Sequence, residues 1–271
     1  MTLLSEHGPD AQVLAGGQSL IPALNMRLSA PAMLVDINRI ESLRGLRQDG
    51  RSLNIGALVR HCEVLESAVV AREVPLLASA MTHVAHMAVR NRGTTCGSLA
   101  LADPAAEMPA VAMLLDAVLH LRSSSGARDV RARKFFKGLY ETDRSENEIV
   151  TGVSLPCAAQ DEIFHFDELS RRHGDFAIVG VAMKARRNNG RVGDIAAVIF
   201  GSEPAPMLSR ASAAMQLTSA TTDADLRDMA QTIAQEMNPM ESHQGRPDTK
   251  RRQAAELLRR GFAAMQDKLH V

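Results

Sequence analysis

Ala15-Gly16-Gly17-Gln18-Ser19 is the most informative stretch of this sequence. Residues 12–15 favour a short strand, which the glycine pair then ends. Two adjacent glycines let the backbone approach a ligand closely, and consecutive N–H groups can converge on a phosphate oxygen. The stretch has neither the third glycine of a dinucleotide fingerprint nor the Lys-Ser/Thr pair of a P-loop. It is therefore a candidate phosphate-binding bend, and the alternative is an ordinary turn.

A second segment of similar character is Arg90-Asn91-Arg92-Gly93-Thr94-Thr95-Cys96-Gly97-Ser98. Its glycines and hydroxyl side chains allow N–H and O–H groups to surround a diphosphate without steric bulk. The adjoining stretch Asp103-Pro104-Ala105-Ala106-Glu107 predicts a helix start with Asp103 as N-cap. Glu107 is an acceptor suited to the hydroxyls of a ribose or ribityl chain. The alternative for this segment is a capped loop between two helices.

The flanking sequence predicts an α+β protein. Alternating apolar residues indicate strands, and apolar residues three and four positions apart indicate helices. Strands are expected at residues 32–37, 52–59, 117–121, 148–155, 176–186 and 192–200, and helices at 75–89 and 105–116. Asn188-Asn189-Gly190 predicts a hairpin. Residues after 206 are expected to be helical, with an amphipathic helix over 251–269, and the change of pattern predicts a domain boundary near residue 157.

Composition excludes several classes of protein. The 31 basic and 31 acidic residues balance, so no long-range field attracts nucleic acid or an anionic membrane. Apolar runs are too short to span a bilayer, and no signal peptide opens the chain, so a cytoplasmic location is expected. The three cysteines, Cys62, Cys96 and Cys157, are odd in number and widely spaced, a pattern that resembles neither a disulfide framework nor the clustered thiolates of a zinc or iron–sulfur site.

Taken together, the two segments resemble the FAD-binding subunit of the xanthine dehydrogenase and carbon monoxide dehydrogenase family of molybdenum hydroxylases. That family has an Ala-Gly-Gly-(Gln/His)-Ser turn early in the chain and an Arg-Gly-Thr-Ile-Gly-Gly-(Ser/Asn) loop later. Further matching stretches extend the resemblance over nearly the whole chain: Leu20-Ile21-Pro22, Met26-Arg27-Leu28, Leu34-Val35-Asp36-Ile37, Asn54-Ile55-Gly56-Ala57, 102–107 and 172–177.

The resemblance implies an FAD-binding fold of the vanillyl-alcohol-oxidase (PCMH) type. It divides residues 1–157 into a small subdomain (1–50) and a larger one (51–157), followed by a C-terminal flavoprotein domain (158–271) with an antiparallel sheet and helices. Two stretches would hold the FAD diphosphate: Ala15, Gly16, Gly17, Gln18 and Ser19, and Thr94, Thr95, Cys96, Gly97 and Ser98. Ala85 would contact the flavin side through its backbone, Glu107 would face the sugar chain, and Val150 and Glu168 would lie near the cofactor.

Two departures from the family pattern carry their own expectations. Cys96 replaces a family glycine, so a positive φ at this position would strain the loop and weaken FAD binding. The Cys96 thiol is expected to be a small buried filler rather than a redox group. The family also has an extra strand and most of a helix before the stretch matching residues 2–10, and this sequence starts without them.

The resemblance implies an electron-transfer subunit without a catalytic acid or base. Electrons would arrive from 2Fe–2S clusters in a small subunit, fed by a molybdopterin-binding large subunit, and FAD would pass them to an external acceptor. The expected assembly is a heterohexamer, a dimer of heterotrimers. Two alternatives remain: a self-contained FAD oxidase or dehydrogenase, and a non-catalytic scaffold that has lost FAD.

Other polar residues are given structural roles. His83 and His86 lie three positions apart on the expected helix, a spacing that can ligate metal, but no third ligand is evident. Asp175 is expected to form a structural ion pair with Arg171 and Arg172, and the alternative is a contact on the flavin side or with another subunit. The sequence spacing indicates no Ser-His-Asp or Cys-His arrangement.

Overall fold

The computed structural model describes residues 1–270, and the chain forms two compact units that interleave in sequence. The first unit consists of Met1–Val74, Ala85–Asp103 and Asp116–Cys157. The second consists of Pro75–Val84, Pro104–Leu115 and Ala158–Val271. Two short segments that precede the expected boundary near residue 157 therefore pack with the C-terminal part of the chain.

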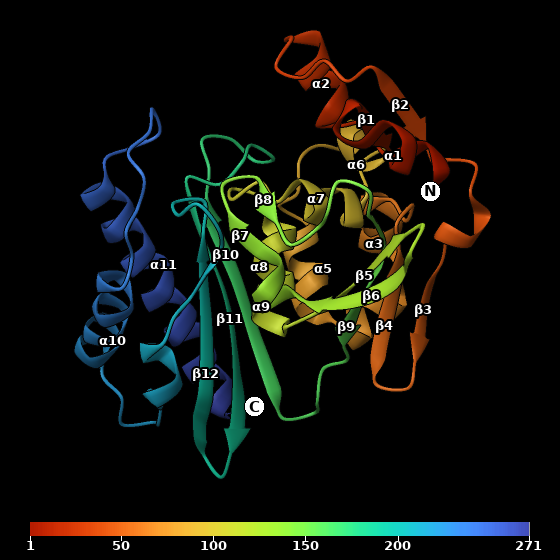
Figure 1. The fold of residues 1–271 in the computed structure, drawn as a ribbon. Coiled ribbons are helices and arrows are strands. Elements are labelled where there is room, and N and C mark those ends of the chain that lie inside the picture. Colours follow the sequence, from red (N-terminus) through yellow and green to blue (C-terminus); the bar gives the residue numbers. More distant parts are fainter. Residues whose placement is uncertain (271) are drawn as a thin grey trace. The chain divides into compact units, whose positions relative to one another are not determined.

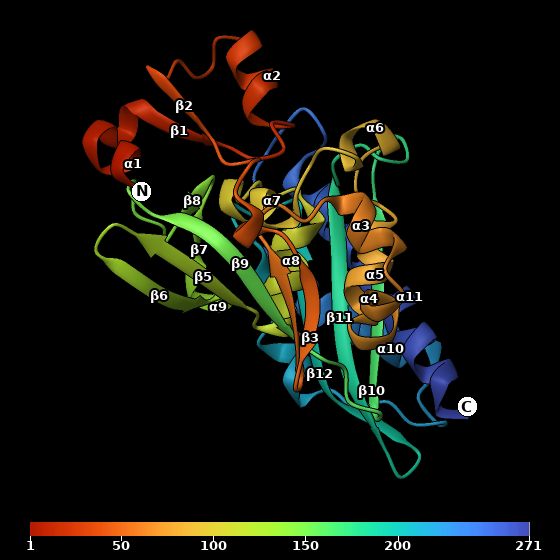
Figure 2. The same cartoon turned by 90° about the vertical axis from the view of Figure 1, so that its right-hand side faces the viewer.

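The first unit begins with a small α/β layer. Strand β1 (Ala11–Leu14) pairs in parallel with β2 (Met33–Asp36), after helix α1 (Thr2–His7) and the 3-10 turn η1 (Gly8–Asp10). Helix α2 (Leu20–Asn25) connects the two strands, as Figures 1 and 2 show at the red end of the chain. The parallel pairing requires this crossover, because a two-residue hairpin can join only antiparallel strands.

A five-stranded antiparallel sheet forms the larger part of the first unit, in the order β3-β4-β9-β5-β6. Its strands are β3 (Leu46–Asp49), β4 (Ser52–Gly56), β5 (Val118–Ser123), β6 (Gly126–Arg131) and β9 (Ile149–Pro156). Leu53 and Ile55 alternate with half-buried residues along β4, which explains why this half-covered strand forms where the alternation predicted it. β3, at the end of the expected small subdomain, pairs with β4.

Short helices and a small hairpin complete the first unit. They are η2 (Glu41–Leu43), α3 (His61–Glu66), α4 (Ala68–Glu73), α6 (Met87–Arg90), α7 (Thr95–Leu101), α9 (Ala132–Phe135), β7 (Phe136–Gly138) and β8 (Glu141–Thr142). Helix α7 packs against β4 and β9 (Figure 2), so the second glycine segment is supported by the sheet.

The second unit is built on a four-stranded antiparallel sheet, β10-β11-β12-β13. The strands are β10 (Glu162–Leu169), β11 (Val179–Asn188), β12 (Arg191–Phe200) and β13 (Met207–Leu208). Asn189 and Gly190 join β11 to β12 with φ of 48° and 74°, so the expected hairpin is confirmed. Strand β13 and the non-helical stretches 215–222 and 236–246 lie in a region expected to be entirely helical, and that expectation was wrong there.

Helices cover both faces of this sheet (Figure 1). On one face α11 (Pro247–Asp267) packs on β10 and β11, and α10 (Asp223–Gln235) packs on α11. Alternate residues of β11, such as Val181 and Met183, belong to the core that these two helices share with the sheet. Helices α5 (Pro75–Met81) and α8 (Glu107–Leu115) contact β10, β11 and β12. The 3-10 turns are η3 (Ala211–Ala214) and η4 (Lys268–His270). The expected α+β class with a C-terminal antiparallel sheet is confirmed.

Two helix predictions need correction. The stretch 75–89 is not one helix, because α5 ends at Met81 and α6 begins at Met87. Between them Ala85 has a φ of 46°, a left-handed conformation that an α-helix does not accommodate. His83 therefore lies in the break, and the metal-binding spacing on a continuous helix disappears. Asp103 is not the N-cap of α8, which begins four residues later; its Oδ2 accepts a hydrogen bond from Tyr140 Oη at 3.0 Å.

Among residues 1–270, no helix is both long and apolar enough to cross a bilayer.

Candidate functional site

The first glycine segment, Ala15-Gly16-Gly17-Gln18-Ser19, forms the connection from β1 to α2, and we call it the Gly-Gly bend. Gly17 has a φ of 73°, which only glycine adopts without strain, and an added Cβ would lie 3.1 Å from Ile21 Cγ1. Within residues 1–270 the N–H groups of Gly16, Gly17 and Gln18 donate no hydrogen bond to the protein. Consecutive unpaired amides of this kind are available to an anion.

The second glycine segment lies directly against the first. We call residues 92–98 the Arg-Gly-Thr loop. A Cβ added at Gly16 would overlap the carbonyl oxygen of Arg92 and would lie 2.9 Å from Gly93 Cα. Gly16 is buried at this contact, which involves backbone atoms on both sides. The two segments, far apart in sequence, therefore meet in space within the first unit, and glycine is required where they touch.

Thr94 organises the Arg-Gly-Thr loop as the N-cap of α7. Its Oγ1 accepts a hydrogen bond from the N–H of Gly97 at 3.0 Å. A Cβ at Gly97 would lie 2.7 Å from the same oxygen, so the cap also requires glycine there. Thr95 is buried, and its Oγ1 has no hydrogen-bond partner among the described residues. Ser98 is half-buried in the first turn that follows.

The strain expected at Cys96 is absent. Cys96 lies in the first turn of α7, outside the positive-φ residues, because the loop has already entered the helix at this point. The side chain is 2 % exposed, and its Sγ lies 3.6 Å from the carbonyl oxygen of Ile55. Burial raises the pKa of the thiol to about 12. Cys96 is thus a protonated, buried filler, as expected, and is not a thiolate at neutral pH.

Two residues that sequence reasoning missed connect the glycine segments. Asn38, just after β2, donates from Nδ2 to the carbonyl oxygen of Ala15 at 2.9 Å and to Asp36 Oδ1 at 2.6 Å. Its Oδ1 accepts a hydrogen bond from Arg60 Nη2 at 2.5 Å. The other terminal nitrogen of Arg60 donates to the carbonyl oxygen of Arg92. Asn38 directly follows the family-like stretch Leu34-Val35-Asp36-Ile37, but nothing in the sequence indicated its partners.

The buried His61 packs against the Arg-Gly-Thr loop at Gly93. The N–H of His61 donates to the carbonyl oxygen of Gly93 at 2.9 Å, and a Cβ at Gly93 would lie 2.8 Å from the imidazole Cδ2. Burial lowers the pKa of His61 to about 4, with a further contribution from the charge of Arg90. His61 is therefore neutral at physiological pH, and its role is packing.

The remaining expected cofactor residues are placed as follows. Ala85 has the positive φ already noted, and its carbonyl oxygen accepts a hydrogen bond from Arg90 Nη1 at 2.8 Å. Val150 is buried in β9 opposite Leu121. Glu107 and Glu168 belong to the second unit, where Glu107 is buried at the start of α8.

Glu168 lies beside His83 inside the second unit. The Glu168 Oε1 lies 3.6 Å from His83 Nδ1, while Oε2 is buried without a hydrogen-bond partner among the described residues. Hydrogen bonding to Glu168 raises the pKa of His83 above its ordinary value, although partial burial opposes this. His83 also contacts the ring of Phe166 at a centroid distance of 5.2 Å. The histidine is thus a structural partner of the carboxylate.

A Ser-His-Asp hydrogen-bond chain exists, although the sequence spacing did not indicate one. His120 Nδ1 lies 2.7 Å from Asp129 Oδ1, and its Nε2 lies 2.6 Å from Ser154 Oγ. The Ser154 hydroxyl also bonds to Asn54, which competes for its single proton. Ser154 lies on β9, which has a partner strand on each side, so its neighbouring amides serve the ladders and cannot stabilise an oxyanion. The chain therefore links four strands and does not form a hydrolase site.

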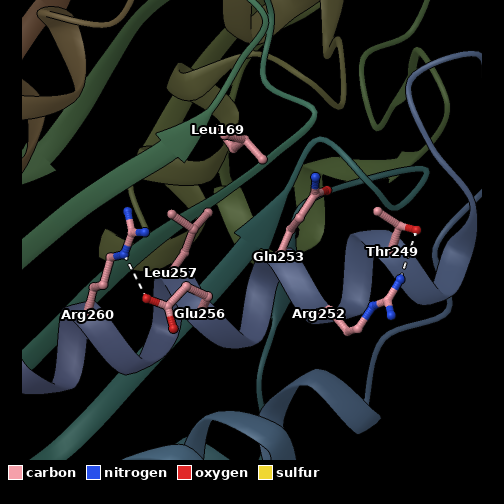
Figure 3. Close-up of a pocket in the computed structure, with 7 residues that line it drawn as sticks. All are labelled: Leu169, Thr249, Arg252, Gln253, Glu256, Leu257 and Arg260. Carbon is pink, nitrogen blue, oxygen red and sulfur yellow. Dashed lines mark hydrogen bonds and ion pairs between the residues drawn. The ribbon is translucent and has the colours of Figure 1, made fainter.

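A shallow cavity of about 290 Å³ lies in the second unit between the end of β10 and α11 (Figure 3). Figure 3 shows Leu257 and Gln253 from α11 on the side of Leu169, with Arg260 directed to Glu256 along the helix. None of the expected cofactor residues lines this cavity. It is therefore separate from the glycine segments.

Comparison with known proteins identifies the class. Residues 1–158 match the family described as the FAD binding domain in molybdopterin dehydrogenase, and residues 164–265 match the CO dehydrogenase flavoprotein C-terminal domain. The chain belongs to this family of molybdopterin dehydrogenase flavoproteins and contains an FAD-binding domain.

Relatives of known activity cover most of the chain. The carbon monoxide dehydrogenase medium chain of Hydrogenophaga pseudoflava is 33% identical over 97% of this chain and 92% of its own length. The 6-hydroxypseudooxynicotine dehydrogenase complex subunit alpha of Paenarthrobacter nicotinovorans is 41% identical over 67% of this chain. That alignment spans only 62% of the relative's length, as does the one to the caffeine dehydrogenase subunit beta of a Pseudomonas strain.

Solved structures agree in fold. Quinoline 2-oxidoreductase from Pseudomonas putida 86 superposes with a TM-score of 0.94 at 32% identity, covering 100% of this chain and 94% of that chain. Carbon monoxide dehydrogenase from Hydrogenophaga pseudoflava superposes with a TM-score of 0.92 at 34% identity, over 97% and 92% of the two chains. The fold class expected from the sequence is thus confirmed.

Proposed function

We propose that this chain binds one FAD and relays electrons as the flavin subunit of a molybdenum hydroxylase complex. The observation that carries the proposal is the contact of the Gly-Gly bend with the Arg-Gly-Thr loop. The two backbones are so close at Gly16 that no Cβ fits there, and the amides of the bend have no hydrogen-bond partner among the described residues. Membership of the family, including relatives that are medium chains of dehydrogenases, supports it.

The residues present fit the cofactor. The amides of Gly16, Gly17 and Gln18 would hold the negatively charged diphosphate, and residues 94–98 would complete its surroundings. Cys96 leaves the loop unstrained, so the departure from the family glycine does not argue against binding. Bound FAD supplies the redox chemistry, and this chain orients the cofactor and sets its electrostatic environment.

We also propose Ser19, Ala85, Val150, Glu107 and Glu168 as cofactor contacts, because the family resemblance assigns these roles to their positions. No side chain is needed as an acid or base for electron relay. The raised pKa of Cys96 keeps its thiol protonated at neutral pH, so the thiol does not act as a nucleophile toward the flavin.

The partners in the proposal are a large molybdopterin-binding subunit and a small subunit with 2Fe–2S clusters, assembled as a dimer of heterotrimers. Among residues 1–270 no group of three or more His, Cys, Asp or Glu side chains could hold a metal ion, so these centres are assigned to other chains. The three cysteines are free, which supports a reducing, cytoplasmic location.

Purification tests the proposal. The chain expressed alone should be yellow and release close to one FAD per polypeptide on denaturation, and affinity purification from its native host should recover a molybdenum-containing chain and an iron–sulfur chain. A colourless protein that takes up no FAD would favour the scaffold alternative. Dehydrogenase activity in the single purified chain would favour the self-contained enzyme.

A further inference from the structure

Asn38 has an amide orientation that its neighbours determine. Its Nδ2 faces three acceptors, the carbonyl oxygens of Leu14 and Ala15 and Asp36 Oδ1. Its Oδ1 faces the Arg60 guanidinium. The flipped amide would place an oxygen against three oxygens and an N–H against an arginine, so only one assignment satisfies all partners. The backbone N–H of Asn38 also donates to Asp36 Oδ1 at 2.9 Å, which holds the side chain in place.

Arg60 bridges the two glycine segments through this amide. One terminal nitrogen bonds to Asn38 and the other to the carbonyl oxygen of Arg92, the atom that lies against Gly16. A guanidinium presents its donors in a fixed fork, so it holds both acceptors at one separation. The backbone N–H of Arg60 donates to Glu63 Oε2 at 2.7 Å, which anchors the residue at the start of α3.

The bridge spans elements that no continuous secondary structure connects. It runs from the Gly-Gly bend through Asn38 and Arg60 to Arg92, and its three links span 23, 22 and 32 residues of sequence. Because all four positions lie in the first unit, the bridge exists independently of the second unit. The Gly-Gly bend and residues 92–94 lie outside the helices and strands. Segments of this kind are the most mobile part of a fold unless they are tied down.

We infer that Asn38 and Arg60 act together as a clamp that holds the Gly-Gly bend against the Arg-Gly-Thr loop in the geometry that binds the diphosphate. This inference rests on the proposed FAD binding. Both are positioning residues, since they act through the backbone of Ala15 and Arg92. An ordered pair of loops binds more tightly than a mobile pair, because the ordering cost is met before the ligand arrives.

Three single variants of the full chain, one double variant and one control test the clamp. Asn38→Asp keeps the size and the acceptor for Arg60 but replaces the Nδ2 donor with an oxygen facing Ala15 and Asp36. Arg60→Gln removes the fork, and Arg60→Lys keeps the charge but offers a single donor group. Arg122→Gln is the matched control, because Arg122 is an exposed arginine on β5, outside the clamp.

The measurement is the dissociation constant for FAD by flavin fluorescence titration, with the melting temperature of each free protein. We expect Asn38→Asp and Arg60→Gln each to weaken FAD binding by about tenfold or more. Arg60→Lys should recover part of the loss, and Arg122→Gln should bind like the wild type. The double variant Asn38→Asp/Arg60→Gln should lose little more than either single variant, because the two residues form one unit.

Hydrogen exchange of the free protein provides a second readout that requires no cofactor. Arg60→Gln should increase exchange in peptides covering residues 15–19 and 92–98, while peptides from β4 and β9 stay protected. If the wild-type chain binds FAD, two results would overturn the clamp. One is wild-type FAD affinity in both Asn38→Asp and Arg60→Gln, and the other is unchanged hydrogen exchange in these peptides. A wild-type chain that binds no FAD would instead overturn the proposed function and the clamp's role in it.

Discussion

Gly16→Ala is the sharpest perturbation of the candidate site. Its added Cβ would overlap the Arg92 carbonyl oxygen and lie 2.9 Å from Gly93 Cα and 3.1 Å from Arg92 C. All three are backbone atoms, so no side chain can rotate away and the two glycine segments must separate. Gly16 is outside the positive-φ residues, so the conformation itself does not penalise alanine.

The expected magnitude follows from this overlap. Overpacking a well-packed contact costs about 1–3 kcal/mol, and a backbone overlap falls at the upper end of that range. If FAD binding requires the two segments in contact, about 2–3 kcal/mol of this cost appears in the binding free energy. That corresponds to a dissociation constant about 30- to 150-fold weaker.

The assay is titration of the purified apoprotein with FAD, with circular dichroism and melting temperature as folding controls. Gly193→Ala is the matched variant, because a Cβ at Gly193 has its nearest neighbour at 3.8 Å and that residue also lies outside the positive-φ set. It should bind FAD like the wild type. A folded Gly16→Ala protein with wild-type affinity would refute the idea that this contact forms the binding site.

Three further substitutions give distinct outcomes. Gly17→Val should abolish flavin retention, since φ of 73° and neighbours at 3.1 Å and 3.2 Å both oppose a branched side chain; flavin absorbance after gel filtration checks this, and a yellow variant contradicts it. Cys96→Ala should leave FAD affinity within about threefold of the wild type and cost about 1 kcal/mol in urea unfolding, because the thiol only fills space; loss of flavin redox activity would show another role. The pKa of His61 falls from 6.5 to about 4 on folding, so the unfolded state binds the extra proton and stability should decline as pH falls from 6.5 to 4, by about 3 kcal/mol in total. His61→Leu should lack that decline in urea unfolding at the two pH values, and an identical slope would exclude His61 as its source.

The glycine segments were predictable because their requirement is local. Glycine is needed where a neighbouring atom leaves no room for a Cβ, as at Gly16 and Gly97, or where φ is positive, as at Gly17. The residue type alone signals such positions. The hairpin at Asn189 and Gly190 and the alternation in β4 were predictable for the same reason.

Other features depend on contacts between residues far apart in sequence, which the spacing of apolar residues does not predict. The helix expected over 75–89 breaks because Ala85 adopts a left-handed conformation, which alanine propensity alone would not suggest. The clamp joins Asn38, Arg60 and Arg92, and each of these residues taken singly resembles a solvated polar residue. The sequence raised the question of strain at Cys96, which depended on a positive φ there. Cys96 has no positive φ because it lies in the first turn of α7, and the start of this helix was not apparent from the loop sequence.

Comparison of FAD with riboflavin tests the central claim most directly, because the two share the isoalloxazine ring and ribityl chain, while FAD adds the diphosphate and the adenosine attached to it. If the amides of the Gly-Gly bend hold that diphosphate, two hydrogen bonds to a charged group contribute about 3 kcal/mol or more, and FAD should bind at least about 100-fold more tightly than riboflavin. Equal affinity for the two flavins in the purified wild-type chain would contradict a diphosphate site where the glycine segments meet.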